Sequence, residues 1–248
     1  MTRLLPVGVC LGLTALWWLA ASGSPIFPTP GAVLLGIASL VKDGTLLRHV
    51  TASLYRVTYG YGIALLLALP LGILMGWSRT AFTSFNPVVQ MLRPISPIAW
   101  IPLAILWFGV GDLSPMFLVF LASFFPMVLA TSSGVHLVER EYLWAAQNFG
   151  VTGLKLFTHV IIPGALPTII TGMRVGLGVA WLVVVAAEMV AINSGLGFLI
   201  MDSRNAGMRY DLVVAGMVMI GVIGLLLDLV MRRLENLKEV RWRYARGR

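Results

Sequence analysis

The sequence predicts an all-α membrane protein with about six transmembrane helices, and three observations support that prediction. Of the 248 residues, 58% are hydrophobic and only 11% are charged, and the mean hydropathy is +0.91. Soluble domains average about 45–50% apolar and about 25% charged residues, so this composition disfavours a soluble enzyme, a disordered chain and a secreted disulfide scaffold. The apolar residues form runs near the ~20 residues that a helix needs to cross a bilayer. Lys and Arg lie mainly between these runs.

The first apolar run covers residues 4–21 and follows Arg3. It ends in the letters AASGSP, which look like a signal-peptide cleavage site. Because the rest of the chain is itself polytopic, an uncleaved first span is the simpler interpretation.

The next segment predicts an interfacial region on the outer side of the membrane. Two moderately amphipathic pieces cover residues 32–41 and 46–55, and they carry or adjoin the charges of Lys42, Arg48 and Arg56. Charged amphipathic pieces of this length are typical of a membrane interface. We therefore expect residues 1–56 to form a first helix with a periplasmic interfacial segment. The rest divides into a transmembrane core at residues 57–234, which includes a cytoplasmic hairpin at residues 139–163, and a basic cytoplasmic tail at residues 235–248.

Five further apolar runs complete the six predicted spans. They cover residues 57–77, 95–110, 114–135, 166–192 and 212–231. The run at 95–110 contains two prolines, so we expect a kinked helix whose freed carbonyls are satisfied by protein neighbours.

The distribution of basic residues predicts the orientation. With six spans both termini lie on one side, and 13 of the 18 Lys and Arg residues lie on that side or at its membrane edge. Lys and Arg are enriched in cytoplasmic loops, so we expect both termini in the cytoplasm. The long polar stretch at residues 136–159 then lies in the cytoplasm as well.

Three pairs of glycines spaced four residues apart predict close helix packing. The pairs are Gly8 with Gly12, Gly72 with Gly76, and Gly172 with Gly176. Small residues at this spacing let two helix backbones approach each other.

A helical hairpin is predicted at residues 139–163. Two helix-like pieces, at residues 139–149 and 153–160, are separated by Gly150, which can adopt a positive φ at little cost. Pro163 and Pro167 are expected to stop or redirect the chain before the next span. On spacing alone, a partner-docking hairpin and a plain solvated loop fit equally well.

The residues of this hairpin resemble the coupling motif of the permeases of ABC importers, the binding-protein-dependent inner-membrane component family. The family pattern is Glu-Ala-Ala, three residues, Gly, nine residues, Ile, one residue, Leu-Pro. This sequence keeps that spacing with Ala145, Ala146, Gly150, Val160, Ile162 and Pro163. Trp144 stands where the family has Glu, and Glu141 lies one helical turn upstream.

The stretches MLRPISPIAWIPLAILWFG and SGLGFLIMDS also resemble permeases of the nitrate, sulfonate, taurine and bicarbonate subfamily. The resemblance implies a homodimeric permease of the type I importer fold in a bacterial inner membrane. It implies separate subunits that bind ATP and Mg, and a periplasmic or lipid-anchored solute-binding protein. Glu141, Trp144, Ala145, Ala146, Gly150, Val160 and Pro163 would then form the surface that seats in the ATPase. The implied solute is a small oxyanion, and related permeases are associated with organic ligands such as thiamine precursors.

The sequence predicts no catalytic, cofactor or metal site in this chain. It contains no GxxxxGK[ST] phosphate loop, no HExxH and no CxxC spacing, so we expect energy to come from another subunit. The C-terminal tail interleaves basic and aromatic residues. Anchoring on anionic membrane lipid is favoured for it over nucleic-acid binding.

Arg174 and Glu188 are the charges placed deepest in an apolar run. They are 14 residues apart, which is roughly 21 Å along a helix and roughly 40° around it, so they share a face. One hypothesis is that both line a passage between two copies of the chain. The alternative is that Arg174 extends to the membrane surface and Glu188 caps the outer end of its helix. A second function class, an ion-coupled secondary transporter, would use the two residues with Asp228 as a relay.

Overall fold

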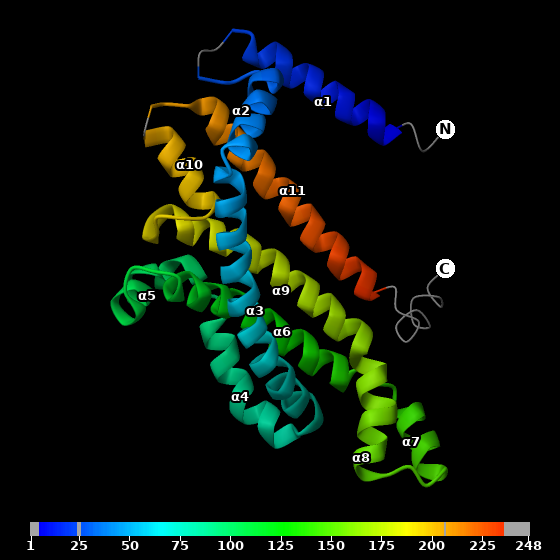
Figure 1. Cartoon of the computed structure of the whole chain (residues 1–248). Coiled ribbons are helices and arrows are strands. Elements are labelled where there is room, and N and C mark those ends of the chain that lie inside the picture. Colours follow the sequence, from blue (N-terminus) through cyan, green and yellow to red (C-terminus); the bar gives the residue numbers. More distant parts are fainter. Residues whose placement is uncertain (1–4, 24–25, 206, 236–248) are drawn as a thin grey trace.

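The computed structural model describes residues 5–23, 26–205 and 207–235, and this part of the chain is helical without strands (Figure 1). Its α-helices are α1 (Leu5–Ala21), α2 (Pro30–Lys42), α3 (Thr45–Trp77), α4 (Arg79–Leu92), α5 (Ile101–Phe108), α6 (Leu113–His136), α7 (Arg140–Asn148), α8 (Gly153–Leu156), α9 (Ile162–Ala191), α10 (Leu196–Asn205) and α11 (Tyr210–Glu235). A 3₁₀ turn at Pro97–Trp100 precedes α5, and a π turn at Phe157–Ile161 joins α8 to α9.

The centre of the molecule is α6, which packs between α3 and α9. A Cβ atom at Gly72 of α3 would lie 2.8 Å from the carbonyl oxygen of Val128, and one at Gly172 of α9 would lie 2.2 Å from Cβ of Ala130. Both helices therefore approach α6 where only glycine fits. This confirms the predicted close packing for the pairs Gly72 with Gly76 and Gly172 with Gly176. Around Gly8 and Gly12 in α1 nothing in the described chain lies within 4 Å.

Replacing Gly72 by alanine is expected to destabilise the protein by about 1–3 kcal/mol, because the added methyl group pushes α3 away from α6. Gly62 on the same helix is the matched control, since nothing lies within 4 Å of its Cβ position. The measurement is the thermal unfolding midpoint of both variants in detergent. Equal midpoints would show that the contact between α3 and α6 tolerates a Cβ atom.

Four helical segments are long and apolar enough to cross a membrane: α3, α6, the segment Gly153–Val190 and α11. The pair formed by α4 and the segment Pro97–Phe108 is bent by 82° and gives a fifth span only if it is counted as one. The six-span count is therefore not confirmed. The segment predicted as a kinked span at residues 95–110 is too short to cross a membrane by itself, because α5 has 8 residues and spans only about 12 Å.

Prolines and a glycine explain why that segment is short. Pro97 begins the 3₁₀ turn, Pro102 lies in the first turn of α5, and Gly109 ends the helix with φ +74°. Each proline lacks the N–H that would continue a longer helix.

A second difference concerns the boundary expected between residues 56 and 57. Residues 46–55 are not a separate interfacial piece, because they form the first turns of α3, which has 33 residues and is about 50 Å long. Arg56, which was expected at an interface, is 1% exposed within that helix. The first piece is a separate helix as expected, α2, capped by the Thr29 side chain.

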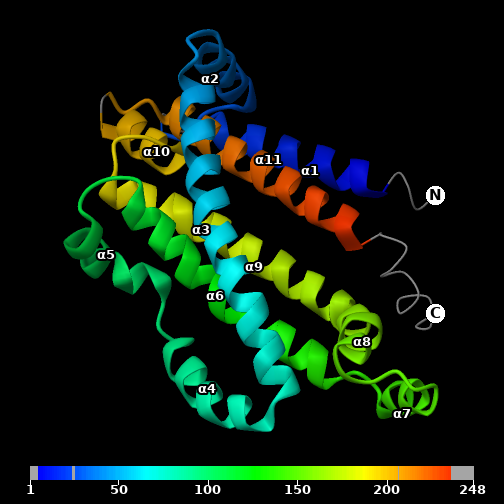
Figure 2. The ribbon, with the colours of Figure 1, turned by 60° about the horizontal axis from the view of Figure 1, so that its bottom comes forward.

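The helices place distant segments at common ends of the bundle. The start of α1, the end of α11 and the α7–α8 hairpin lie toward one end in both views (Figures 1 and 2). The helices α2, α5 and α10 gather at the other end. The first end is called the hairpin end below. Residues 236–248 of the predicted basic tail lie outside the described residues.

Candidate functional site

The predicted turn at Gly150 is present and has a defined hydrogen-bond pattern. The N–H of Gly150 donates to the Gln147 carbonyl at 2.9 Å, and the N–H of Val151 donates to the Ala146 carbonyl at 2.9 Å. This pair of bonds is the Schellman motif, which ends a helix with one residue in the left-handed conformation. Gly150 supplies that residue, with φ +77°.

The second arm of the hairpin continues into the membrane without a break. After Gly153, α8 leads through the π turn into α9, so that Gly153–Val190 forms one run of 38 residues. The chain therefore does not stop at Pro163 and Pro167, so that part of the prediction is wrong, but the helix changes direction between α8 and α9 (Figure 1), as the alternative of a redirected chain predicts. The wider π turn lies directly before Pro163, where the proline ring would otherwise meet the carbonyl of His159.

The motif residues divide between two sides of the hairpin. Ala146 and Val160 pack with the buried cluster around Leu156 and Ile161, which fixes the hairpin on the base of α9. Pro163 is half-buried in the first turn of that helix. The others, Glu141, Trp144, Ala145 and Gly150, are exposed.

The exposed side of the hairpin is unusually apolar for a loop. The side chains of Trp144, Phe149 and Leu154 are 58%, 87% and 78% exposed. Clustered exposed apolar side chains mark interaction sites. These exposed apolar side chains favour the docking interpretation over a plain solvated loop, and the docking role stays a prediction.

A buried ion cluster lies at the other end of the bundle, around Glu188. Arg56 donates from Nη1 to Glu188 Oε1 at 2.7 Å, and Ser53 Oγ donates to Oε2 at 2.8 Å. The backbone N–H of Gly197 donates to the same Oε2 at 3.1 Å. Arg56 is 1% exposed and Glu188 is 0% exposed, so the charges are shielded from solvent within the chain.

Arg56 also joins two further segments to this cluster. Its Nε donates to Asp112 Oδ1 at 2.8 Å, and its Nη1 donates to the Ser194 carbonyl at 2.8 Å. His49 Nδ1 accepts the N–H of Gly195 at 3.0 Å. One arginine therefore holds α3, α9, the residue before α6 and the segment before α10 together.

Sequence reasoning missed Arg56 as a functional candidate. The available signal was its spacing: Arg56, Ser53 and His49 lie three and seven residues apart, on one face of a helix. A polar stripe of this kind on a mostly apolar helix must face protein or water.

Arg174 belongs to a different ion cluster, which lies toward the hairpin end of the bundle. Its Nε and Nη2 donate to the two carboxylate oxygens of Asp228, at 2.6 and 3.1 Å, which makes the pair bidentate. Its Nη1 donates to Glu235 at 3.3 Å, and Arg232 also binds Asp228 at 2.8 Å. The Arg174 side chain is 29% exposed, and the cluster joins α9 to α11.

The structure thus does not bring Arg174 and Glu188 together. Each is paired with a residue on another helix, so a role in lining a passage would require its ion pair to open. That role stays a prediction for both residues. Arg174 and Asp228 meet, while Glu188 lies in the other cluster and does not join them in a relay.

Within the described ranges, no group of three or more His, Cys, Asp or Glu residues could hold a metal ion.

Comparison with known proteins identifies relatives of this chain. Residues 68–240 match the family model described as the binding-protein-dependent transport system inner membrane component. The chain is 38% identical to the taurine transport system permease protein TauC of Escherichia coli (strain K12), over 94% of this chain and 87% of TauC. It is 32% identical to the nitrate import permease protein NrtB of Synechocystis sp., over 91% of this chain and 85% of NrtB.

A solved structure of the MetNI methionine ABC transporter, in an inward-facing conformation, has a similar fold. The TM-score is 0.61 at 16% sequence identity, with 76% of this chain and 95% of the compared chain covered. At that identity the likeness concerns the fold alone.

Proposed function

This chain belongs to the family of binding-protein-dependent transport system inner membrane components, and on that premise we propose that it imports a small oxyanion. It is the permease subunit of an ABC importer. In the proposed assembly, two copies form the passage, a solute-binding protein delivers the anion from outside, and separate subunits bind ATP. The proposed location is the bacterial inner membrane, with both termini in the cytoplasm.

In this proposal the hairpin couples ATP hydrolysis in the partner subunit to transport. The observation that best supports this role is the continuous helix from the hairpin into the bundle. An ATP-binding subunit that moves α7 also moves α8, because both pack on the same buried cluster. The run Gly153–Val190 then carries the displacement along α9 to Glu188, which is held by Arg56 of α3. The run is helical along its whole length, so successive backbone hydrogen bonds link the hairpin to α9 through the π turn.

An oxyanion is proposed because of the relatives. TauC is named for taurine, which carries a sulfonate, and NrtB is named for nitrate. Nitrate is a small anion with three equivalent oxygens, and taurine is a zwitterion at neutral pH whose sulfonate presents three equivalent oxygens around sulfur. Bicarbonate is another small oxyanion, and an organic ligand such as a thiamine precursor is the alternative for the same kind of importer. The alternative of an ion-coupled secondary transporter is disfavoured, because its relay residues fall in two separate clusters.

The apolar surface of the single chain supports a homodimer in a membrane. α1 carries exposed Leu11, Leu13 and Leu16, and α5 carries exposed Leu106 and Trp107. Faces of this kind must be covered by lipid or by a second protein chain.

Co-purification tests the proposed function. The tagged full-length chain is co-expressed with the ATP-binding subunit of the proposed importer, and the complex is extracted in mild detergent. We expect the ATP-binding subunit to be retained in a fixed ratio to the permease. A chain that transports its solute in vesicles without any bound ATPase would contradict the proposal and support the secondary transporter.

Replacing Arg174 by leucine is expected to reduce uptake by about tenfold or more without loss of the ATP-binding subunit, if Arg174 contributes to the anion's passage. Arg174→Lys should be milder if the anion needs only a positive charge, and nearly as severe if the anion needs the paired donors of a guanidinium. The matched control is Arg232→Leu, which removes another cation from the same carboxylate. Uptake at the wild-type rate in the leucine variant, measured in reconstituted vesicles, would limit Arg174 to joining α9 and α11.

A further inference from the structure

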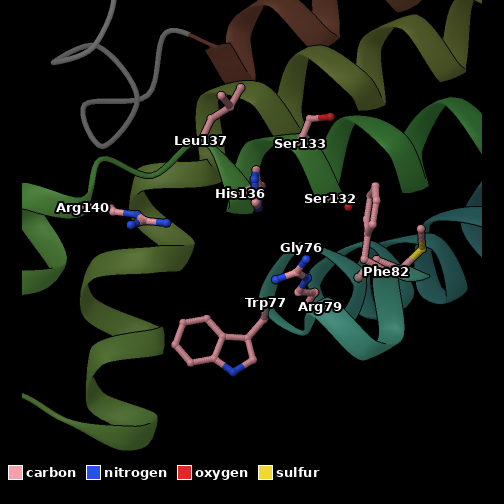
Figure 3. Close-up of a pocket in the computed structure, with 10 residues that line it drawn as sticks. Gly76, Trp77, Arg79, Phe82, Ser132, Ser133, His136, Leu137 and Arg140 are labelled. Carbon is pink, nitrogen blue, oxygen red and sulfur yellow. The ribbon is translucent and has the colours of Figure 1, made fainter. Parts of the chain in front are cut away.

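A cavity lies beside the base of the hairpin, where α3, α4 and α6 meet (Figure 3). Its volume is about 610 Å³, and it is lined by the end of α3, the start of α4, the end of α6 and the first residue of α7. This volume falls within the range of about 300–1,000 Å³ that is typical of small-molecule sites. The cavity is separate from both ion clusters, since none of their residues lines it.

The charged side chains around this cavity, Arg79 and Arg140, have one sign. His136 also lines it, and no Asp or Glu is among its lining residues. Figure 3 shows Arg79 and Arg140 extending from opposite sides toward the space beside His136. In the part of the chain that the structure describes, neither arginine forms an ion pair, whereas Arg56 and Arg174 do. A cleft lined by one sign of charge with apolar walls concentrates ions of the opposite sign.

The rest of the wall defines what kind of anion fits. Trp77 and Phe82 supply aromatic surface, and Ser132 and Ser133 supply hydroxyl groups. α4 begins at Arg79, so the positive end of a 14-residue helix also lies at this wall. An inorganic ion alone would leave most of the cavity unfilled. The wall suits an anionic head carried on an apolar body.

We propose that this cavity binds a phosphate or sulfonate head group on an apolar body, held between Arg79 and Arg140. Arginine matches such oxygens with paired N–H donors. The ligand could come from a soluble organic anion or from an anionic phospholipid, and both present the same head-group chemistry. Because α7 packs on α8 and the π turn, a ligand held by Arg140 of α7 and Arg79 of α4 would link the hairpin to α4. A sulfonate is also among the solutes proposed for the importer, so the dependence of binding on Arg79 and Arg140, and not binding alone, decides the inference.

Binding of two probes to the full-length chain tests the proposal. Calorimetric titration with hexanesulfonate, in nanodiscs of phosphatidylcholine, measures a soluble amphiphilic anion. Native mass spectrometry of the chain extracted from membranes that contain phosphatidylglycerol measures a retained lipid. The variant is Arg79→Gln with Arg140→Gln, and the matched control is Arg93→Gln, an exposed arginine at the other end of α4.

We expect the double variant to lose about tenfold or more in affinity for at least one probe, because two charge-assisted contacts are removed. The control should bind as the wild type does. Arginine-dependent hexanesulfonate binding would identify a soluble ligand, and arginine-dependent lipid retention would identify a phospholipid. If neither probe binds, or if both bind the double variant as tightly as the wild type, the proposal is wrong. The two arginines would then be available for ion pairs with the ATP-binding subunit. That result would leave the co-purification test of the importer unaffected.

Discussion

Replacing Arg56 by leucine is expected to destabilise the protein by about 3–5 kcal/mol, because it leaves a buried carboxylate without its cation. Glu188 is 0% exposed, and Arg56 is its ion-pair partner in the described chain. Asp112 loses the same cation. The measurement is equilibrium unfolding in mixed micelles, followed by tryptophan fluorescence.

Two further variants separate the ion pair from a general effect of the substitution. Arg48→Leu removes an exposed arginine from the same helix and should change stability by less than about 0.5 kcal/mol. Adding Glu188→Gln to Arg56→Leu should recover part of the loss, because the amide oxygen still accepts from Ser53 and Gly197. An Arg56→Leu variant as stable as Arg48→Leu would mean that the cluster does not hold the helices together.

Replacing Gly150 by valine is expected to abolish most of the coupling between ATP hydrolysis and uptake. Gly150 has φ +77°, and a residue with a Cβ pays about 1–2 kcal/mol in the left-handed conformation, more for a branched side chain. The end of α7 must then move, and Trp144 and Phe149 move with it. The membrane helices are untouched, so insertion should be normal.

Asparagine is the matched substitution, because it tolerates the left-handed conformation better than other residues with a Cβ. We expect Gly150→Asn to keep most of the uptake and solute-stimulated ATP hydrolysis of the wild type, and Gly150→Val to lose about tenfold or more. Both activities are measured in reconstituted vesicles. If valine stays within about twofold of asparagine, the hairpin is only a loop.

The long helices could be predicted because they depend on local composition. The runs at residues 114–135 and 212–231 differ from α6 and α11 by at most four residues at either end. The run at residues 95–110 is equally apolar, yet it forms only a 3₁₀ turn and the 8-residue helix α5. Composition shows that a segment can enter a membrane, but it does not show where the helix begins and ends: α6 continues past Pro126, whereas α5 begins beside Pro102 and ends at Gly109.

The turn of the hairpin could also be predicted, because it too depends on local sequence. The turn at Gly150 depends on one residue and its neighbours, so spacing located it correctly. The continuation through Pro163 depends on the π turn before it, and no sequence pattern indicated that turn.

The two ion clusters could not be predicted from local patterns. Arg56 and Glu188 lie 132 residues apart, and Arg174 and Asp228 lie 54 residues apart. The sequence identified Glu188 and Arg174 as costly charges in apolar runs. Their partners follow only from the packing of α9 against α3 and α11, which a single helix does not encode.

Cross-linking from the tip of the hairpin tests most directly whether it docks on the ATP-binding subunit. Cys10 is the only cysteine, so Cys10→Ser gives a background for one introduced thiol. Phe149→Cys labels the 87% exposed tip, and Leu47→Cys labels an exposed position at the opposite end of the bundle. With a short thiol-to-amine reagent and the assembled complex, we expect Phe149→Cys to give an adduct with the ATP-binding subunit and Leu47→Cys to give none. An intact complex that yields no such adduct from Phe149→Cys, or yields it from Leu47→Cys instead, would contradict the coupling role of the hairpin.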